Sequence, residues 1–193
     1  ICETCHTPHG GVNNRRLILS VEDPNTRSVL CEVCHTTLPG MASDPSLNRF
    51  SHPLDLTPGL SVSVPQRWKD GAAVVLGTGG ELVCRTCHIP HGAVASSPLL
   101  AQSNRKDSFC IQCHTNQASM KESIHYREIV KQDEKNVLGQ RASEVGPCAP
   151  CHLVHQGTGK LMWARKEKIT FDKPGEMCVN CHRPEGSASK VMP

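Results

Sequence analysis

The sequence is poor in the residues that usually build a protein core. Aromatic residues make up 3% of its 193 residues, with Tyr126 the single tyrosine. No hydrophobic run approaches the ~20 residues of a membrane-spanning helix. Fourteen prolines and fifteen glycines interrupt almost every stretch, which excludes long regular elements. Large apolar side chains therefore cannot supply the core by themselves.

Unpaired cysteine is also missing. All 12 cysteines fall into C-x-x-C pairs, and a histidine follows every pair immediately. A disulfide framework requires neither feature, and zinc ribbons have no use for a histidine directly after each pair. C-x-x-C-H is the attachment signature of c-type haem, in which two thioether bonds hold the porphyrin and the histidine ligates the iron. The sequence therefore predicts six covalently bound haem c groups.

The predicted haem sites involve eighteen residues. The attachment cysteines are Cys2, Cys5, Cys31, Cys34, Cys84, Cys87, Cys110, Cys113, Cys148, Cys151, Cys178 and Cys181. The proximal iron ligands, called the attachment histidines, are His6, His35, His88, His114, His152 and His182. With so little chain per haem, we expect the porphyrins to be the core and the thioether links to staple the chain to it.

The motifs occur in pairs, which indicates an internal repeat. Only the first motif of each pair has a second histidine three residues after the attachment histidine. These +3 histidines are His9, His91 and His155. The pattern predicts a single hexahaem cytochrome domain of three two-haem units, about residues 1–60, 61–135 and 136–193.

The five histidines outside the motifs are candidate distal ligands: the +3 histidines and two linker histidines, His52 and His125. Residues three apart on a helical turn lie on the same side, so a +3 histidine should reach a neighbouring haem. The simplest assignment sends it to the other haem of its own unit. The linker histidines are expected to serve first-motif haems, or alternatively to be solvated or bonded to propionates.

Six bis-histidine irons need twelve histidines, and the chain has eleven. One iron must take another ligand, stay five-coordinate or use a histidine from elsewhere. If the linker histidines serve the unit before them, the haem of Cys148 and Cys151 lacks one. If they serve the unit after them, the haem of Cys2 and Cys5 does.

Few regular elements are expected. The C-x-x-C-H segments should form short helical turns, and a helix capped by Ser119 should cover 119–131. A hairpin is predicted over 72–84 and a short strand over 60–64. The longest haem-free stretch, 36–83, should be a surface excursion, and the tail from Pro184 should be flexible.

The formal net charge of the polypeptide is +3, but each ferric haem contributes about −1 once its propionates are included. The oxidised protein should carry about −3, so its basic residues do not indicate nucleic-acid binding. Haem c is attached outside the cytoplasm, so we expect export with the signal peptide removed. Because only Ile1 precedes the first haem cysteine, we expect a processed or trimmed chain.

The repeated C-x-x-C-H, with C-x-x-C-H-x-P-H-G at 2–10 and 84–92, resembles the multihaem c-type cytochromes with doubled C-x-x-C-H motifs. Among them it is most similar to the polymerising outer-surface cytochromes, the extracellular cytochrome nanowires. The resemblance implies a chain that is mostly coil, with short helices and little strand, wrapped around a stack of six haems. It also implies mostly bis-histidine ligation and a homopolymer with end-to-end contacts.

These features predict electron transfer along stacked haems, as the subunit of a conductive filament at the cell surface or outside the cell. Its partners would be redox proteins or extracellular acceptors. An enzyme is not expected, because saturated irons bind no substrate and little chain is left to wall a pocket. The alternatives are a monomeric periplasmic electron carrier and a multihaem reductase with one open haem.

Overall fold

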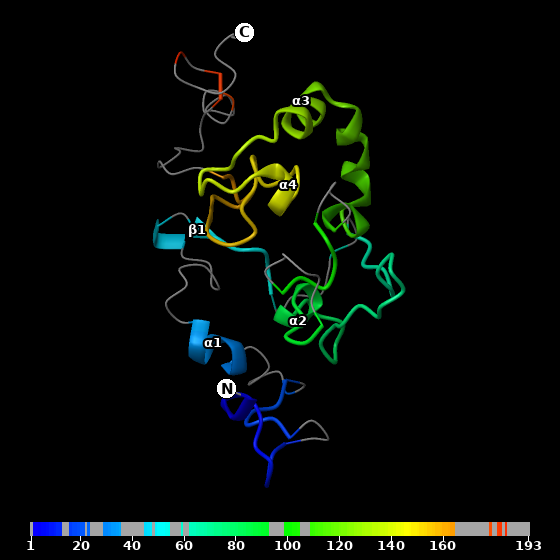
Figure 1. Cartoon of the computed structure of the whole chain (residues 1–193), viewed down its shortest axis with the longest axis vertical. Helices are drawn as coiled ribbons and strands as arrows, with labels where there is room; N and C mark the ends of the chain where they lie inside the picture. The colour runs from blue at the N-terminus through cyan, green and yellow to red at the C-terminus, as the bar shows by residue number, and fades with distance from the viewer. Residues whose placement is uncertain are drawn as a thin grey trace.

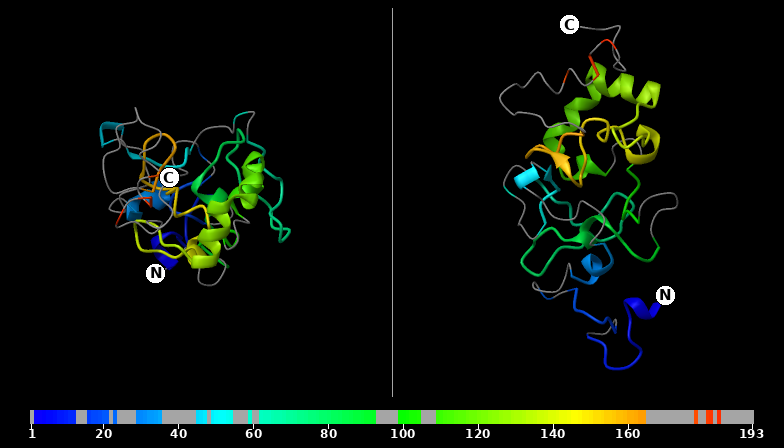
Figure 2. Two further views of the ribbon diagram at one scale, coloured as in Figure 1. Left: turned by 90° about the horizontal axis from the view of Figure 1, so that it is seen from above. Right: turned by 90° about the vertical axis from the view of Figure 1, so that its left-hand side faces the viewer.

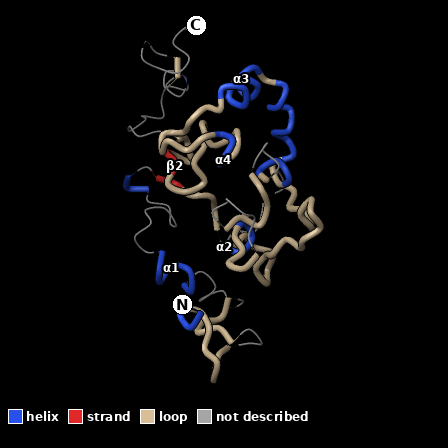
Figure 3. Tube along the Cα trace, in the orientation of Figure 1, coloured by secondary structure: helices blue, strands red, loops and turns tan. Residues whose placement is uncertain are grey.

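The structure is a computed structural model. It describes residues 2–12, 16–21, 23, 29–35, 45–47, 49–54, 59, 62–92, 99–104, 109–164, 178, 181, 182 and 184. Most of these residues lie in loops and turns (Figure 3). The expectation of a mostly coil chain with short helices and little strand is therefore confirmed for the described part, whereas the division into three units stays a prediction.

The regular elements are short. The helices are η1 (Cys2–Thr4), α1 (Val29–His35), η2 (Pro45–Leu47), α2 (Cys84–Cys87), η4 (Cys110–Gln112), η5 (Thr115–Glu122), α3 (Ile124–Gln132) and α4 (Ala142–Val145). The strands β1 (Arg49–Phe50) and β2 (Gly157–Thr158) form one antiparallel pair. No helix of the described residues combines the length and apolarity that a membrane crossing needs.

The C-x-x-C-H segments form short helical turns, as predicted. In five of them the attachment histidine donates its backbone N–H to the carbonyl of the first cysteine, at 2.9–3.0 Å. The remaining motif, Cys31–His35, lies within α1. The turn brings both cysteines and the histidine together, which is the local arrangement that haem attachment needs.

Protein side chains provide only a small core. The accessible surface of the chain is 12654 Å², against about 9,000 Å² for a compact monomer of this mass. Among the described residues, more large apolar side chains are exposed than buried. The buried apolar residues are Leu17, Val21, Trp68, Val83, Ala101, Ala142 and Ala164. The polypeptide therefore leaves much of its apolar surface uncovered, as expected for a chain that packs around a large apolar group.

The molecule is elongated, and its motifs follow one another along the long axis (Figures 1 and 2). The described segments near the N-terminus, in blue, form one end, and the described red segments near the C-terminus lie toward the other end. Helices α1 and α2, which contain the second and third motifs, follow the N-terminal segment along this axis.

The linker after the second motif, expected to be a surface excursion, is partly docked on the rest of the chain in its described residues. Its strand β1 pairs with β2, with Arg49 opposite Thr158. The buried Ser51 hydroxyl accepts the N–H of Gln156 at 3.1 Å. His52 donates its backbone N–H to the backbone carbonyl of Val154 at 2.7 Å. Residues 49–52 therefore dock on the third unit, more than 100 residues later, whereas Ser63 and Lys69 bond to residues of the fourth motif.

Three local predictions need correction. The helix begins at Ile124, because Ser123 and not Ser119 caps it, with its hydroxyl accepting the N–H of Tyr126 at 3.1 Å. The turn at 77–80 of the predicted hairpin is present, but the hairpin strands do not pair as expected. The backbone N–H of Val74 donates to the carbonyl of Gln66 and not to a residue after the turn. Val62 and Val64 lie in coil. Leu60 and the tail beyond Pro184 lie outside the described residues.

Candidate haem sites

Each first motif continues into a loop that returns to it, here called the histidine loop: residues 6–18, 88–101 and 152–164. In all three, the residue after the attachment histidine donates its N–H to a carbonyl late in the loop: Thr7 to Arg16, Ile89 to Leu99 and Leu153 to Met162, at 2.7–2.8 Å. Two residues farther on, Ile18, Ala101 and Ala164 donate to the carbonyl of the second cysteine, at 2.8–3.0 Å. The loop closes on the motif and holds it.

The three loops also share their backbone conformation. The residue after each +3 histidine has a positive φ: Gly10 at 71°, Gly92 at 72° and Gln156 at 55°. Glycine adopts this conformation freely, whereas glutamine does so at a cost. The third copy departs from the sequence pattern at this position and still keeps the conformation, which indicates that the loop geometry itself is required.

Eight of the eleven histidines face one another in four ring pairs. The pairs are His6 with His91 (centroids 6.0 Å apart, 40° between planes), His88 with His155 (6.3 Å, 23°), His52 with His114 (6.1 Å, 76°) and His125 with His182 (6.0 Å, 70°). Every pair joins one attachment histidine to one candidate distal histidine. Sequence reasoning assigned the two groups but not these partners.

The ring spacing fits a metal held between two axial imidazoles. A metal–imidazole bond of about 2.0–2.1 Å on each side, plus about 1.1 Å from nitrogen to ring centre, gives centroids a little over 6 Å apart. No group of three or more His, Cys, Asp or Glu side chains suited to one metal ion occurs in the described part of the chain. Two facing histidines beside two cysteines are the donor set of haem c, so the residues present fit that group.

The pairs contradict the assignment of +3 histidines within a unit. His91 lies opposite His6, and His155 opposite His88, so these two +3 histidines reach back to the first motif of the preceding unit. The linker histidines also differ from expectation, because both face the attachment histidine of a second motif. His6 faces His91, so the haem of Cys2 and Cys5 has a candidate distal histidine.

His9, His35 and His152 belong to none of the four pairs. The side chains of His9 and His35 are exposed. The His152 ring stacks on Trp163 with centroids 4.7 Å apart, and its Nδ1 lies 2.9 Å from the carbonyl of Leu161. A hydrogen bond from Nδ1 to a carbonyl leaves Nε2 as the metal-binding atom. The sequence did not predict these two contacts. Leu17 occupies the position in the first loop that Trp163 occupies in the third, so the repeat does not contain an aromatic residue that would have pointed to the stacking.

His52 is half-buried. Burial lowers the pKa of its imidazole, and charge on His114 and His155 adds to the shift. Burial also lowers the pKa of His152, with a contribution from His114. A neutral imidazole is the form that ligates iron. His52 faces His114 and its backbone N–H bonds to Val154, so the fourth and fifth motifs lie near each other.

The cysteines of successive motifs also lie near one another. A hydrogen bond with the Cys84 thiol raises the pKa of Cys31, with further contributions from burial and from charge on Cys84 and Cys5. Burial raises the pKa of Cys87 to about 12, and charge on Cys113 adds to the shift. With haem attached, these sulfurs would be thioethers and would not titrate. The pKa shifts are used here only because they show that cysteines of consecutive motifs lie near one another.

The fifth and sixth motifs show the same closeness. Burial raises the pKa of Cys151 to about 11, and charges on Cys181, Cys148 and Cys178 add to it. Neighbouring sulfurs or histidines therefore link every pair of consecutive motifs along the chain.

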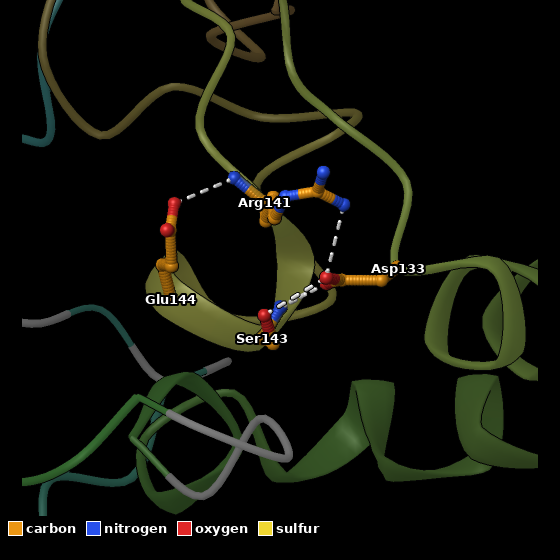
Figure 4. Close-up of polar contacts among 4 residues, drawn as sticks. All are labelled: Asp133, Arg141, Ser143 and Glu144. Carbon is orange, nitrogen blue, oxygen red and sulfur yellow. Dashed lines mark hydrogen bonds and ion pairs between the residues drawn. The ribbon is translucent and has the colours of Figure 1, made fainter.

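A polar clasp positions the helix that carries His125. Asp133 ends α3 with a left-handed φ of 51°, and its carboxylate accepts from the N–H of Ser143 at 2.7 Å and its hydroxyl at 3.1 Å (Figure 4). Arg141 lies 3.4 Å away and donates its backbone N–H to Glu144 at 3.0 Å. The clasp joins α3 to α4, just before the fifth motif.

Residues 1–40 and 76–119 match the family described as the doubled CXXCH motif. The match supports a multihaem c-type cytochrome. It covers a little under half of the chain and includes the first four motifs. Such motifs indicate covalently bound haem c and a role in electron transfer. No curated protein and no solved structure matches the chain significantly.

Proposed function

We propose that the chain conducts electrons along six haems that follow one another from its first motif to its last. The observation that carries the proposal is the closeness of consecutive motifs: Cys5 to Cys31, Cys31 to Cys84, Cys87 to Cys113, His114 to His152 and Cys151 to Cys181. Thioether attachment at such neighbouring sulfurs keeps the haems together, and a continuous series of close haems carries charge from one end of the molecule to the other.

The four ring pairs supply axial ligands to the haems of the first, third, fourth and sixth motifs. An iron with histidine on both faces has no position left for a substrate. The chain's contribution is then to hold each haem, orient its two imidazoles and keep neighbouring haems in contact. We therefore propose an electron carrier and not an enzyme.

The finer proposal is a filament built from head-to-tail copies. His91 and His155 each reach back to the first motif of the preceding unit. His9 occupies the same loop position in the first unit, so it is suited to reach back to a preceding unit as well. His152 is the first-motif histidine outside the four pairs. One copy's His9 therefore complements the preceding copy's His152, and such a heterologous contact propagates into an open filament.

This arrangement supports a role at the cell surface or outside the cell, where a filament carries electrons to redox proteins or extracellular acceptors. The same geometry would join successive units of a longer polypeptide. A chain that stays monomeric would instead serve as a periplasmic electron carrier.

Electron microscopy of the concentrated haem-loaded protein tests the filament. We expect filaments for the native chain and for Lys69→Ala, a change at an exposed residue far along the chain from His9. His9→Ala should abolish them or shorten them severely. Compact particles alone, from the native chain at high concentration, would reject the filament and leave the monomeric carrier.

A further inference from the structure

Residues 49–52, here called the docking segment, follow the second motif in sequence but contact the third histidine loop. Strand β1 of this segment pairs with β2 of the loop, and both strands are drawn in red in Figure 3. The docking segment also carries His52, whose ring faces that of His114 in the fourth motif. The loop that it contacts carries His155, whose ring faces that of His88 in the third motif. One short segment therefore lies beside two candidate distal ligands.

The docking segment holds the backbone on both sides of His155. The carbonyl of the residue before His155 accepts the backbone N–H of His52 at 2.7 Å. The residue after it, Gln156, donates its N–H to the Ser51 hydroxyl at 3.1 Å and accepts from the Arg49 guanidinium through its carbonyl at 3.4 Å. Hydrogen bonds from a distant segment thus fix the two residues that flank His155, and with them the direction of its side chain.

These contacts lie mostly out of solvent. Ser51 is buried, and so is Thr158, whose hydroxyl accepts from the Arg49 guanidinium at 2.9 Å. A buried polar group that loses its hydrogen-bond partner is costly, because water cannot replace the partner. The third histidine loop therefore keeps its position only while Arg49 and Ser51 are in place.

The third histidine loop has a particular need for such contacts. Its residue after the +3 histidine is Gln156, with φ of 55°, where the first and second loops have Gly10 and Gly92. A residue with a side chain adopts this left-handed conformation at a cost, whereas glycine does not. Hydrogen bonds to both backbone groups of Gln156 offset that cost. The docking segment thus stabilises in the third loop a conformation that glycine permits in the other two.

We infer that Arg49 and Ser51 are positioning residues that hold His155 against the haem of the third motif. The segment to which they belong also holds His52 against the haem of the fourth motif. The inference rests on the proposed ligation, in which His155 and His52 are axial ligands. Arg49 and Ser51 act through the backbone of the histidine loop and not as ligands. Because one segment serves both histidines, displacing it loosens the ligation of two consecutive haems together.

Carbon monoxide titration of the reduced, haem-loaded protein tests the inference with the double change Arg49→Ala, Ser51→Ala. We expect two more molecules bound per chain than in the native protein, because the loosened histidines no longer exclude the ligand. The matched double change Ser63→Ala, Arg67→Ala removes an exposed hydroxyl and an exposed guanidinium from the same linker. It should leave the native value unchanged.

Removing one haem at a time assigns the added molecules. In the variant that lacks Arg49 and Ser51, a further change of Cys84 and Cys87 to alanine should remove one added molecule. A change of Cys110 and Cys113 should instead remove the other. Added binding confined to one of these two haems would reject the shared positioning.

The native protein separates this inference from the proposed ligation. Carbon monoxide that binds the native chain and is lost with Cys84 and Cys87 would mean that His155 does not close that iron, so the proposed ligation itself would fail. If the third haem of the native chain is closed and the double change adds no binding, the ligation stands and the positioning role is overturned, even where the thermal midpoint falls.

A milder variant decides the case in which the double change prevents folding. Ser51→Ala alone should weaken the same low-spin electron paramagnetic resonance signal that His155→Ala removes. Ser51→Thr, which keeps the hydroxyl, should restore that signal. A signal that is identical in the native protein and in Ser51→Ala would overturn the inference.

Discussion

The first and second motifs of each unit share a five-residue signature but are built differently. A first motif continues into a hydrogen-bonded loop, and in the second and third units the loop's +3 histidine faces a histidine of the preceding unit. The second motif at Cys110 continues into η5 instead, and His114 and His182 face histidines from linkers. The ring planes differ accordingly, at 40° and 23° for first-motif pairs against 76° and 70° for second-motif pairs. One attachment chemistry thus supports two kinds of ligand environment.

The largest expected effect comes from removing a ligand of one kind. His155→Ala should open the haem of Cys84 and Cys87 and add one carbon monoxide per chain. The added binding should persist when Cys178 and Cys181 are also changed to alanine. Its disappearance in that combined variant would assign His155 to the sixth haem, within its own unit.

The second prediction concerns the electronic structure of the oxidised haems. The angle between two axial imidazole planes sets the splitting of the iron d orbitals, so near-parallel and near-perpendicular pairs differ in their low-spin signals. We expect electron paramagnetic resonance to show both types, and His155→Ala to weaken the near-parallel type alone. A single type of signal would contradict the difference between first and second motifs.

The third prediction concerns the histidine loop. A Cβ added at Gly157 would collide with the backbone of Met162, whereas one added at Gly59 meets nothing within 4 Å. Gly157→Ala should therefore destabilise the protein by about 1–3 kcal/mol, seen as a lower thermal midpoint. Gly59→Ala is the control, and equal midpoints for the two variants would show that the loop tolerates expansion.

The smallest effect is expected at the clasp that positions a linker histidine. The backbone N–H and hydroxyl of Ser143, together with Arg141, hold the pKa of Asp133 below its usual range. A lowered pKa stabilises the fold above the unfolded value of about 3.9, and the contribution is lost as pH falls. Asp133→Asn should lower the thermal midpoint slightly at pH 7 and not at pH 3.

Glu122→Gln, a change at an exposed carboxylate outside the clasp, should leave the midpoint unchanged at both pH values. A loss at Asp133 that persists at pH 3 would mean that the asparagine disturbs the left-handed end of α3 instead of its charge.

Much of the site could be predicted because haem attachment is encoded locally. Two cysteines and a histidine within five residues suffice, and proline and glycine content is enough to exclude long elements. The helix containing His125 was also foreseen, although its start was not, since Ser119 and Ser123 offer the same capping group and only backbone geometry distinguishes them.

The choice of distal partners could not be predicted. The three-residue spacing predicted that a +3 histidine does not ligate the iron bound by its own motif. It did not distinguish between the haems of the neighbouring motifs as the one that the histidine reaches. The docking of residues 49–54 on the third unit was equally hidden, because a two-residue strand pairing across more than 100 residues has no sequence signal.

By itself, the sequence determined the attachment chemistry of this protein: paired C-x-x-C-H motifs, which indicate covalently bound haem c, and additional histidines that can serve as ligands. The tertiary structure decided which histidine rings face one another in the four pairs. The physical reason is that covalent attachment depends on five consecutive residues, whereas an axial pair depends on two segments brought face to face by loops that close on one unit and linkers that dock on another.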